Sequence, residues 1–201
     1  MFKVSSVFAG ILILAGFLAH AQTTEATQAD AGKPAATVRG GTGKTAETAS
    51  PSAFVVDLEK HWTTAQGLAV AVAEAMPVDD YSFKPVLEEM SFGEQIMHIA
   101  EANYGYCAFL TDAKSPFVEL AKDAKIKKAE AIKQLTGSFE YCSAAFSKVT
   151  EGDLDAVHGT GDHKFVARDV MLGGMIHMVH HRGQAEVYLR LKGIKPPDYK
   201  W

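Results

Sequence analysis

Cysteine and proline are both scarce in this chain. Only Cys107 and Cys142 occur among 201 residues, which is too few for a disulfide-built scaffold, and their spacing matches no zinc-finger pattern. The two thiols either form one bridge or stay free and buried. None of the 7 prolines interrupts residues 165–191, so that segment can form one long helix.

The chain also lacks an excess of basic charge. Its 20 Lys and Arg face 24 Asp and Glu, which gives a formal net charge of −4 and leaves no basic field for nucleic acid. Hydrophobic residues make up 47 % of the chain and charged residues 22 %. This composition is typical of a globular protein with one sizeable core.

The first 21 residues predict an export signal that is cleaved. Lys3 supplies a short positive end, residues 4–19 carry no charge, and Ala19-His20-Ala21 fits a small-x-small cleavage site. The alternative is a membrane anchor, but a spanning helix usually needs about 20 apolar residues and this run is shorter. We therefore expect a periplasmic or secreted chain that starts at Gln22, in a compartment where a disulfide is permitted.

Residues 22–52 predict a disordered tether. Ala, Thr, Gly, Ser, Glu and Lys dominate this segment, and large apolar residues are almost absent from it apart from Val38. Such a segment cannot bury enough apolar surface to fold. The folded domain is therefore expected over residues 53–201.

Four long segments with apolar residues at helical spacing follow the tether. They cover residues 54–76, 92–110, 127–149 and 168–192. Ser91 and Glu94 fit a capping box at the start of the second segment. No segment shows sustained two-residue alternation, and the polar, Gly-rich residues 150–164 are expected to link the last two helices without a hairpin. The pattern predicts an all-α four-helix bundle, a fold in which facing helices build metal sites.

The most distinctive stretch lies in the fourth helix and reads Ile176-His-Met-Val-His-His-Arg-Gly-Gln184. His177 and His181 are four residues apart, so they share one helical face. The other members of that face are apolar or small, namely Val170, Gly174, Ala185 and Tyr188. Two imidazoles at this spacing can hold one transition-metal ion. His180 points off the face and is left out as a ligand.

A third imidazole is available on the second helix. His98 shares a face there with Gln95 and Gly105, and the small Gly105 would let another helix approach closely. Glu94 and Glu101 lie four residues before and three residues after His98. Either carboxylate is a candidate partner for an imidazole N–H, although a solvated surface carboxylate is the alternative.

We therefore predict a divalent metal ion bound by His98, His177 and His181, with at least one position open for water or substrate. Several metals suit imidazole, so zinc, nickel, iron and manganese are not distinguished. A zinc-protease helix would read His-Glu-x-x-His, but Met178 stands where the Glu would be. The motif thus contains no general base, and the catalytic residues stay unassigned. The alternative is a set of purely structural core histidines, which would bind no metal.

These residues carry a family resemblance. The chain resembles the DinB family over about residues 54–197, in the runs Ser91-Phe-Gly-Glu-Gln-Ile-Met-His98, His177-x-x-x-His181-Arg-Gly-Gln184 and Tyr188-Leu-Arg-Leu-Lys-Gly-Ile-Lys-Pro-Pro197. The resemblance implies a DinB/YfiT-like four-helix bundle, frequent dimers, and a divalent metal held by one histidine of the second helix and two of the fourth. These ligands map onto His98, His177 and His181. The resemblance also implies a metal-dependent thiol transferase or hydrolase, because family members with known activity belong to those classes.

Two rival functions follow from this combination. The first is an exported metal-dependent enzyme, a thiol S-transferase or hydrolase that acts on a small substrate, possibly a thiol, as a homodimer. The second is a non-catalytic metal-binding or small-molecule-binding protein of an envelope stress response, which the missing general base favours. Neither function involves nucleic acid.

Overall fold

The computed structural model describes residues 52–121 and 124–199. The predicted signal over residues 1–21, and the predicted tether as far as residue 51, lie outside the described residues. The elements are α1 (Ala53–Ala75), the short 3₁₀ helix η1 (Val78–Asp80), α2 (Phe92–Leu110), α3 (Lys128–Phe146), the 3₁₀ helix η2 (Glu151–Asp153), β1 (Val157–Thr160), β2 (His163–Val166) and α4 (Ala167–Leu191). In the described part of the chain, no helix is both long and apolar enough to cross a membrane.

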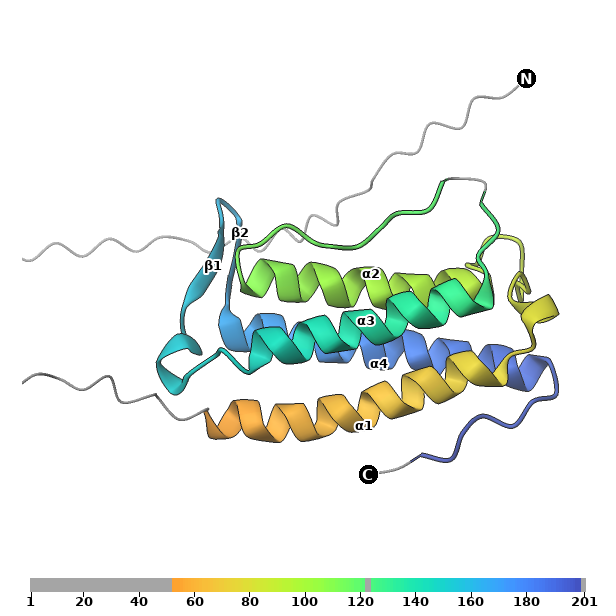
Figure 1. Cartoon of the computed structure of the whole chain (residues 1–201), viewed down its shortest axis with the longest axis horizontal. Coiled ribbons are helices and arrows are strands. Elements are labelled where there is room, and N and C mark those ends of the chain that lie inside the picture. Colours follow the sequence, from red (N-terminus) through yellow and green to blue (C-terminus); the bar gives the residue numbers. More distant parts are fainter. Residues whose placement is uncertain (1–51, 122–123, 200–201) are drawn as a thin grey trace, which may run out of the picture. The chain divides into compact units, whose positions relative to one another are not determined.

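The four long helices form a bundle in which each helix packs against two others (Figure 1). Both α3 and α4 pack against α2, and α1 packs against the same two helices. α1 and α4 run in one direction and α2 and α3 in the other, so the connection between α2 and α3 runs back along the bundle. As a result, α2 and α4, the two helices with the predicted metal ligands, lie side by side and antiparallel.

Aromatic side chains fill much of the core between α1 and α3. The ring of Trp62 lies 4.8 Å from that of Phe139 and 5.3 Å from that of Phe146, measured between centroids. The Trp62 indole N–H donates a hydrogen bond of 3.3 Å to the carbonyl of Phe139, so this buried polar group has a partner. Truncating a ring of this size in a packed core typically costs about 3–5 kcal/mol.

Backbone chemistry fixes the ends of the first and last helices. α1 stops after Ala75 because Met76 is extended, as residues before proline tend to be. At the end of α4, Gly193 adopts a φ of 73°, a conformation that glycine reaches without steric cost. The N–H of Ile194 then donates to the carbonyl of Leu189 at 2.9 Å, as in a Schellman motif. These signals are local, which is why the sequence predicted the helix ends closely.

A two-stranded hairpin before α4 corrects the expectation of an all-α fold. β1 and β2 pair antiparallel, with Val157 opposite Val166 and Thr160 opposite His163. The turn between them is Gly161-Asp162, and Gly161 has a φ of 60°, which the tight turns of hairpins require at this point. The strands are short and bury no side chain fully. They therefore lack the alternation on which the prediction relied.

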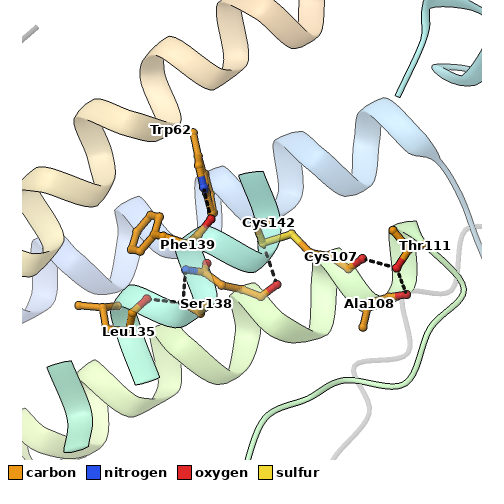
Figure 2. Close-up of a disulfide and its surroundings, with 9 residues drawn as sticks. Trp62, Cys107, Ala108, Thr111, Leu135, Ser138, Phe139 and Cys142 are labelled. Atoms are coloured by element: carbon orange, nitrogen blue, oxygen red, sulfur yellow. Dashed lines mark hydrogen bonds between the residues drawn. A yellow bond between two sulfur atoms is a disulfide. The ribbon is translucent and has the colours of Figure 1, made fainter. Parts of the chain in front are cut away.

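A disulfide joins Cys107 of α2 to Cys142 of α3, with the Cα atoms 5.3 Å apart (Figure 2). This settles a point that the sequence left open. Both residues are buried, and Cys107 lies on the side of α2 that packs against α3. His98 lies nine residues earlier, on roughly the opposite side of α2. The bridge therefore ties α2 to α3 on the side of α2 that faces away from this histidine.

We expect removal of the bridge, by Cys107→Ala together with Cys142→Ala, to lower the free energy of unfolding by about 3–4 kcal/mol. The bridge closes a loop with a sequence separation of 35 residues, and its loss frees the unfolded chain. Urea unfolding followed by circular dichroism measures the change. The midpoint of the parent chain should fall in reductant, whereas that of the double variant should not move. Equal stability of the two chains would contradict the expectation.

Candidate metal centre

Three histidines from two helices meet at one place in the bundle. His98 of α2 and His177 and His181 of α4 each offer a ring nitrogen, and these three atoms lie within 4.8 Å of one another. The ring centroids are 5.0 Å apart for His98 and His177 and 4.5 Å apart for the other two pairs. Imidazoles that bind one ion at about 2.1 Å have their nitrogens at most about 4.2 Å apart. A small movement of the rings toward one another would therefore bring the three nitrogens within reach of one ion.

The predicted face of α4 is confirmed. Its apolar and small members are buried, and His177 and His181 are half-buried between them. Partial exposure means that a ligand can reach the rings from solvent. His180 is exposed and does not belong to the group of ligand atoms.

The two histidines of the hairpin region do not join the centre. His158 Nδ1 lies 3.2 Å from a carboxylate oxygen of Asp112, which pairs β1 with the end of α2. His163 is exposed on β2. Among the residues that the structure describes, His98, His177 and His181 form the one group of three or more histidine, cysteine or acidic side chains arranged to hold a metal ion.

Gln95 orients His181, a role that the sequence did not reveal. Its side chain is 1 % exposed, and its Oε1 lies 2.9 Å from Nδ1 of His181. An amide oxygen can only accept a hydrogen bond, so Nδ1 of His181 carries the proton and Nε2 keeps a bare lone pair. Metal-binding histidines are usually held in this way by a second group. One sequence signal could have revealed this role: Gln95 is a polar residue one turn before His98, on the same inward face of α2.

One of the two candidate glutamates lies beside the centre. A carboxylate oxygen of Glu101 is 3.8 Å from Nδ1 of His98, which is too far for a hydrogen bond. The Glu101 side chain is 58 % exposed, so its carboxylate remains largely in water. Glu94 turns away from His98 and interacts with Ser91 and Lys84 instead.

Burial keeps His177 and His181 uncharged. It is the main cause that lowers the pKa of His181, to about 4, and the neighbouring His177 and His98 lower it further. The pKa of His177 is also lowered, first by burial and then by His98 and His180. Both rings are therefore neutral at neutral pH, which is the form that binds metal ions. Among the described residues, Nδ1 of His177 is buried without a hydrogen-bond partner, so this ring has a nitrogen that the bundle itself leaves unpaired.

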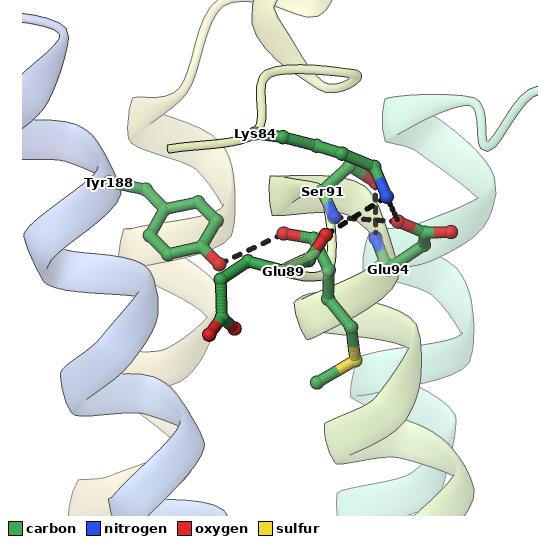
Figure 3. Close-up of polar contacts among 6 residues, drawn as sticks. Lys84, Glu89, Ser91, Glu94 and Tyr188 are labelled. Atoms are coloured by element: carbon green, nitrogen blue, oxygen red, sulfur yellow. Dashed lines mark hydrogen bonds and ion pairs between the residues drawn. The ribbon is translucent and has the colours of Figure 1, made fainter. Parts of the chain in front are cut away.

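Hydrogen bonds at the start of α2 determine where this helix begins and where it lies along α4 (Figure 3). The Ser91 hydroxyl accepts a hydrogen bond from the N–H of Glu94 at 3.3 Å, and the Glu94 carboxylate accepts one from the N–H of Ser91 at 2.6 Å. This confirms the predicted capping box. From α4, Tyr188 points toward the same turn and donates its hydroxyl to the carbonyl of Met90 at 2.9 Å. The capping box fixes where α2 begins, and the bond from Tyr188 holds that start against α4.

Glycines of α4, and not Gly105 of α2, allow the two helices to approach closely. A Cβ atom at Gly173 or Gly174 would lie only 3.3 Å from the side chain of Tyr106, whereas one at Gly105 would meet nothing within 4 Å. The expectation for Gly105 was therefore wrong. The Tyr106 ring lies 6.0 Å from that of His177, so it forms part of the wall beside the centre.

A cavity of about 350 Å³ opens beside His98. Its walls come from α2 and from the connection that precedes α3. Met97 and Phe117 give it apolar surface, and Glu101 and Glu119 give it acidic groups. A small molecule with an apolar part can therefore lie against one of the three histidines.

The fold and this centre define a helical-bundle protein with three histidines positioned to hold a metal ion. The chain belongs to the DinB superfamily, whose family model matches residues 61–185. This confirms the resemblance seen in the sequence.

Two bacterial relatives illustrate the match. The chain is 26 % identical to the uncharacterized protein YjoA of Bacillus subtilis (strain 168) over 137 residues, which cover 66 % of this chain and 87 % of YjoA. The crystal structure of YjoA, a DinB-like protein, aligns at a TM-score of 0.59 and 25 % identity, over 72 % of this chain and 97 % of that one. A DinB-like protein from Bacillus cereus ATCC 10987 shares the fold at a TM-score of 0.62 and 16 % identity, over 71 % and 95 % of the two chains.

We expect the untagged chain to bind one divalent ion, and each of His98→Ala, His177→Ala and His181→Ala to weaken binding by at least about 100-fold. Loss of a ligand should exceed the roughly 10–100-fold effect of losing a group that only orients a ligand. Isothermal titration with Zn²⁺ and Ni²⁺, supported by elemental analysis, measures the affinity and the stoichiometry. Circular dichroism checks that each variant folds.

Two further variants make this test specific. His163→Ala removes an exposed histidine outside the centre and should bind like the parent chain. Gln95→Leu keeps all three ligands but no longer orients His181, so its affinity should fall by about 10–100-fold. Unchanged affinity in the three ligand variants would show that these histidines are structural.

Proposed function

We propose that this DinB protein binds a divalent metal ion through His98, His177 and His181 and uses it in thiol S-transfer or hydrolysis on a small substrate. The observation that carries the proposal is a half-buried group of three imidazoles, one of which, His98, lines a cavity. Three protein ligands leave a coordination position for water or substrate. A divalent ion bound there would lower the pKa of a coordinated water or thiol and so supply a nucleophile.

The chain's own side chains prepare this chemistry. Gln95 fixes the proton of His181 on Nδ1, which leaves Nε2 free for the ion. His98 lies on the wall of the cavity, so a small molecule held there is next to the centre. Met97 and Phe117 give part of that wall an apolar surface. Glu101 offers a carboxylate on the same wall that can take up a proton, a group that the His-x-x-x-His motif itself lacks.

Export of the protein is part of the proposal. The first 21 residues have the pattern of a cleaved signal. The Cys107–Cys142 bridge supports this interpretation, because structural disulfides persist mainly in oxidising compartments such as the periplasm and the extracellular space.

A non-catalytic role in binding a metal or a small molecule is the second candidate function. One observation favours it, namely that the group arranged to hold an ion contains three histidines and no carboxylate. Met178, in the place of a zinc-protease glutamate, is fully buried and cannot act as a base. A protein of this kind would act in an envelope stress response without turnover.

We expect the chain produced with its leader in a bacterial host to be recovered from the periplasm or the medium with Gln22 as its first residue. The small-x-small site ends at Ala21, so the signal peptidase should cut after it. N-terminal sequencing and intact mass identify the first residue. An uncleaved chain in the membrane fraction would show that the leader is an anchor.

We expect the metal-loaded mature chain to turn over a substrate in a screen of small electrophiles with low-molecular-weight thiols and of small esters and amides. Stripping the ion with a chelator should abolish the turnover, and adding the ion back should restore it, because the nucleophile depends on it. His177→Ala should be inactive and His163→Ala fully active. Turnover that survives chelation would refute metal-dependent catalysis, whereas tight metal binding without turnover would favour the binding role.

A further inference from the structure

A second cavity, of about 220 Å³, lies between α1 and α4. The segment that follows α4 contributes Tyr199 to its wall. Apolar side chains form most of its lining, namely Ala65 and Leu68 of α1 and Met175 and Val179 of α4. Among the described residues, none of the three histidines of the metal centre lines it. This cavity is therefore separate from that centre.

An arginine in the lining of this cavity is buried. Arg182 is 9 % exposed, and its Nε has no hydrogen-bond partner among the described residues. A guanidinium group stays protonated in proteins, so burial does not neutralise it. A buried charged donor without an acceptor costs free energy, because it has lost its contact with water and gained no partner. A ligand that brings acceptor oxygens into the cavity would supply that partner.

Glu186 satisfies this guanidinium only in part. Its Oε1 lies 3.7 Å from Nε of Arg182, which is too far for a hydrogen bond. Its Oε2 lies 3.7 Å from a guanidinium nitrogen of Arg190, so one carboxylate is shared between two positive groups. No aspartate or glutamate among the described residues lines the cavity itself. An anion in the cavity would therefore meet positive charge that the chain does not fully neutralise.

Tyr199 stabilises the charge of Arg182 but leaves its donors available. The guanidinium carbon lies 5.9 Å from the centre of the Tyr199 ring, which is a cation–π distance. An aromatic face attracts the charge, yet it supplies no oxygen to accept from the N–H groups. Tyr199 and His61, which also lines the cavity, are both exposed, so a small molecule can enter beside them from solvent.

We propose that this cavity binds a small organic carboxylate, whose charged end pairs with Arg182 and whose apolar part lies against the aliphatic side chains of α1 and α4. The planar guanidinium matches a carboxylate in geometry, because its N–H groups can donate to both oxygens at once. The apolar lining favours an acid with one ring or a short hydrocarbon chain over inorganic phosphate, which has no apolar part. The inference rests neither on metal binding nor on catalysis.

Benzoate is a suitable probe, because it joins one carboxylate to one apolar ring. We expect a titration of the ¹⁵N-labelled mature chain, followed by NMR, to give saturable shifts of amides in α1 and α4 around the cavity. Benzamide has the same shape without the charge and should bind at least about 10-fold more weakly. The titration is run with Zn²⁺ and again after chelation, and the result should be the same, since the cavity lies apart from the metal centre.

Substitutions at the charged groups test the role of Arg182. Arg182→Met should raise the dissociation constant for benzoate by at least about 30-fold, and Arg182→Lys, which keeps the charge but loses the fork of donors, by about 10-fold. Glu186→Gln removes the competing carboxylate and should lower it by about 3-fold or more. If Arg182 served only to pair with Glu186, no such gain would appear. Arg168→Met, at the other end of α4, is the matched control and should bind like the parent chain.

A variant that leaves Arg182 in place keeps the test valid if the Arg182 variants fail to fold. Ala65→Leu puts a larger side chain into the cavity from the wall of α1 and should abolish benzoate binding by filling the space. Circular dichroism checks the fold of every variant.

The outcomes separate this site from its alternatives. Benzoate binding that a folded Arg182→Met or Ala65→Leu variant loses, and that Glu186→Gln strengthens, supports the proposal. A parent chain without saturable shifts overturns it, and so does a chain that binds benzamide equally well. Benzoate binding that needs Zn²⁺ or disappears in His177→Ala would place the carboxylate on the metal centre and also overturn it. Tighter binding of inorganic phosphate than of benzoate would refute the apolar part of the assignment.

Discussion

The antiparallel packing of α2 against α4 is the contact on which the rest of the structure depends. Each helix alone carries an incomplete ligand set, and only their alignment brings His98 to His177 and His181. That alignment rests on side-chain-to-backbone bonds, such as the one from Tyr188 to Met90, and on glycines of α4 that admit Tyr106. Such bonds tolerate little sliding, because hydrogen bonds weaken steeply with distance and angle.

Burying a cluster of three imidazoles lowers the stability of the folded chain unless their polar atoms have partners. Burial holds His177 and His181 neutral, and one nitrogen of His177 has no hydrogen-bond partner among the described residues. A buried polar atom without a hydrogen bond costs about 1–3 kcal/mol. A core built for stability alone would use apolar side chains here. The arrangement of the three rings is one that could hold a metal ion.

Local sequence signals predicted where the helices lie and which histidines face inward. The features that depend on contacts between distant segments could not be predicted in this way. The capping box at Ser91 placed the start of α2 correctly, and helical spacing identified the inward face of His177 and His181. The bond from His181 to Gln95 spans the two helices, so no local pattern contains it. The hairpin had one local signal, the Gly161-Asp162 turn, but its strands bury no regular face. The state of the cysteines depended on how α2 and α3 meet.

The Cys107–Cys142 bridge has a further mechanical consequence. It joins α2 and α3 covalently, whereas no covalent cross-link within the described residues joins α4 to either of them. The contact between α2 and α4 can therefore loosen without breaking this bridge. His98 lies on one side of the contact between α2 and α4, and His177 and His181 lie on the other. An ion bound between them would therefore hold the two helices together. Binding and release of that ion would then change how readily α2 and α4 separate.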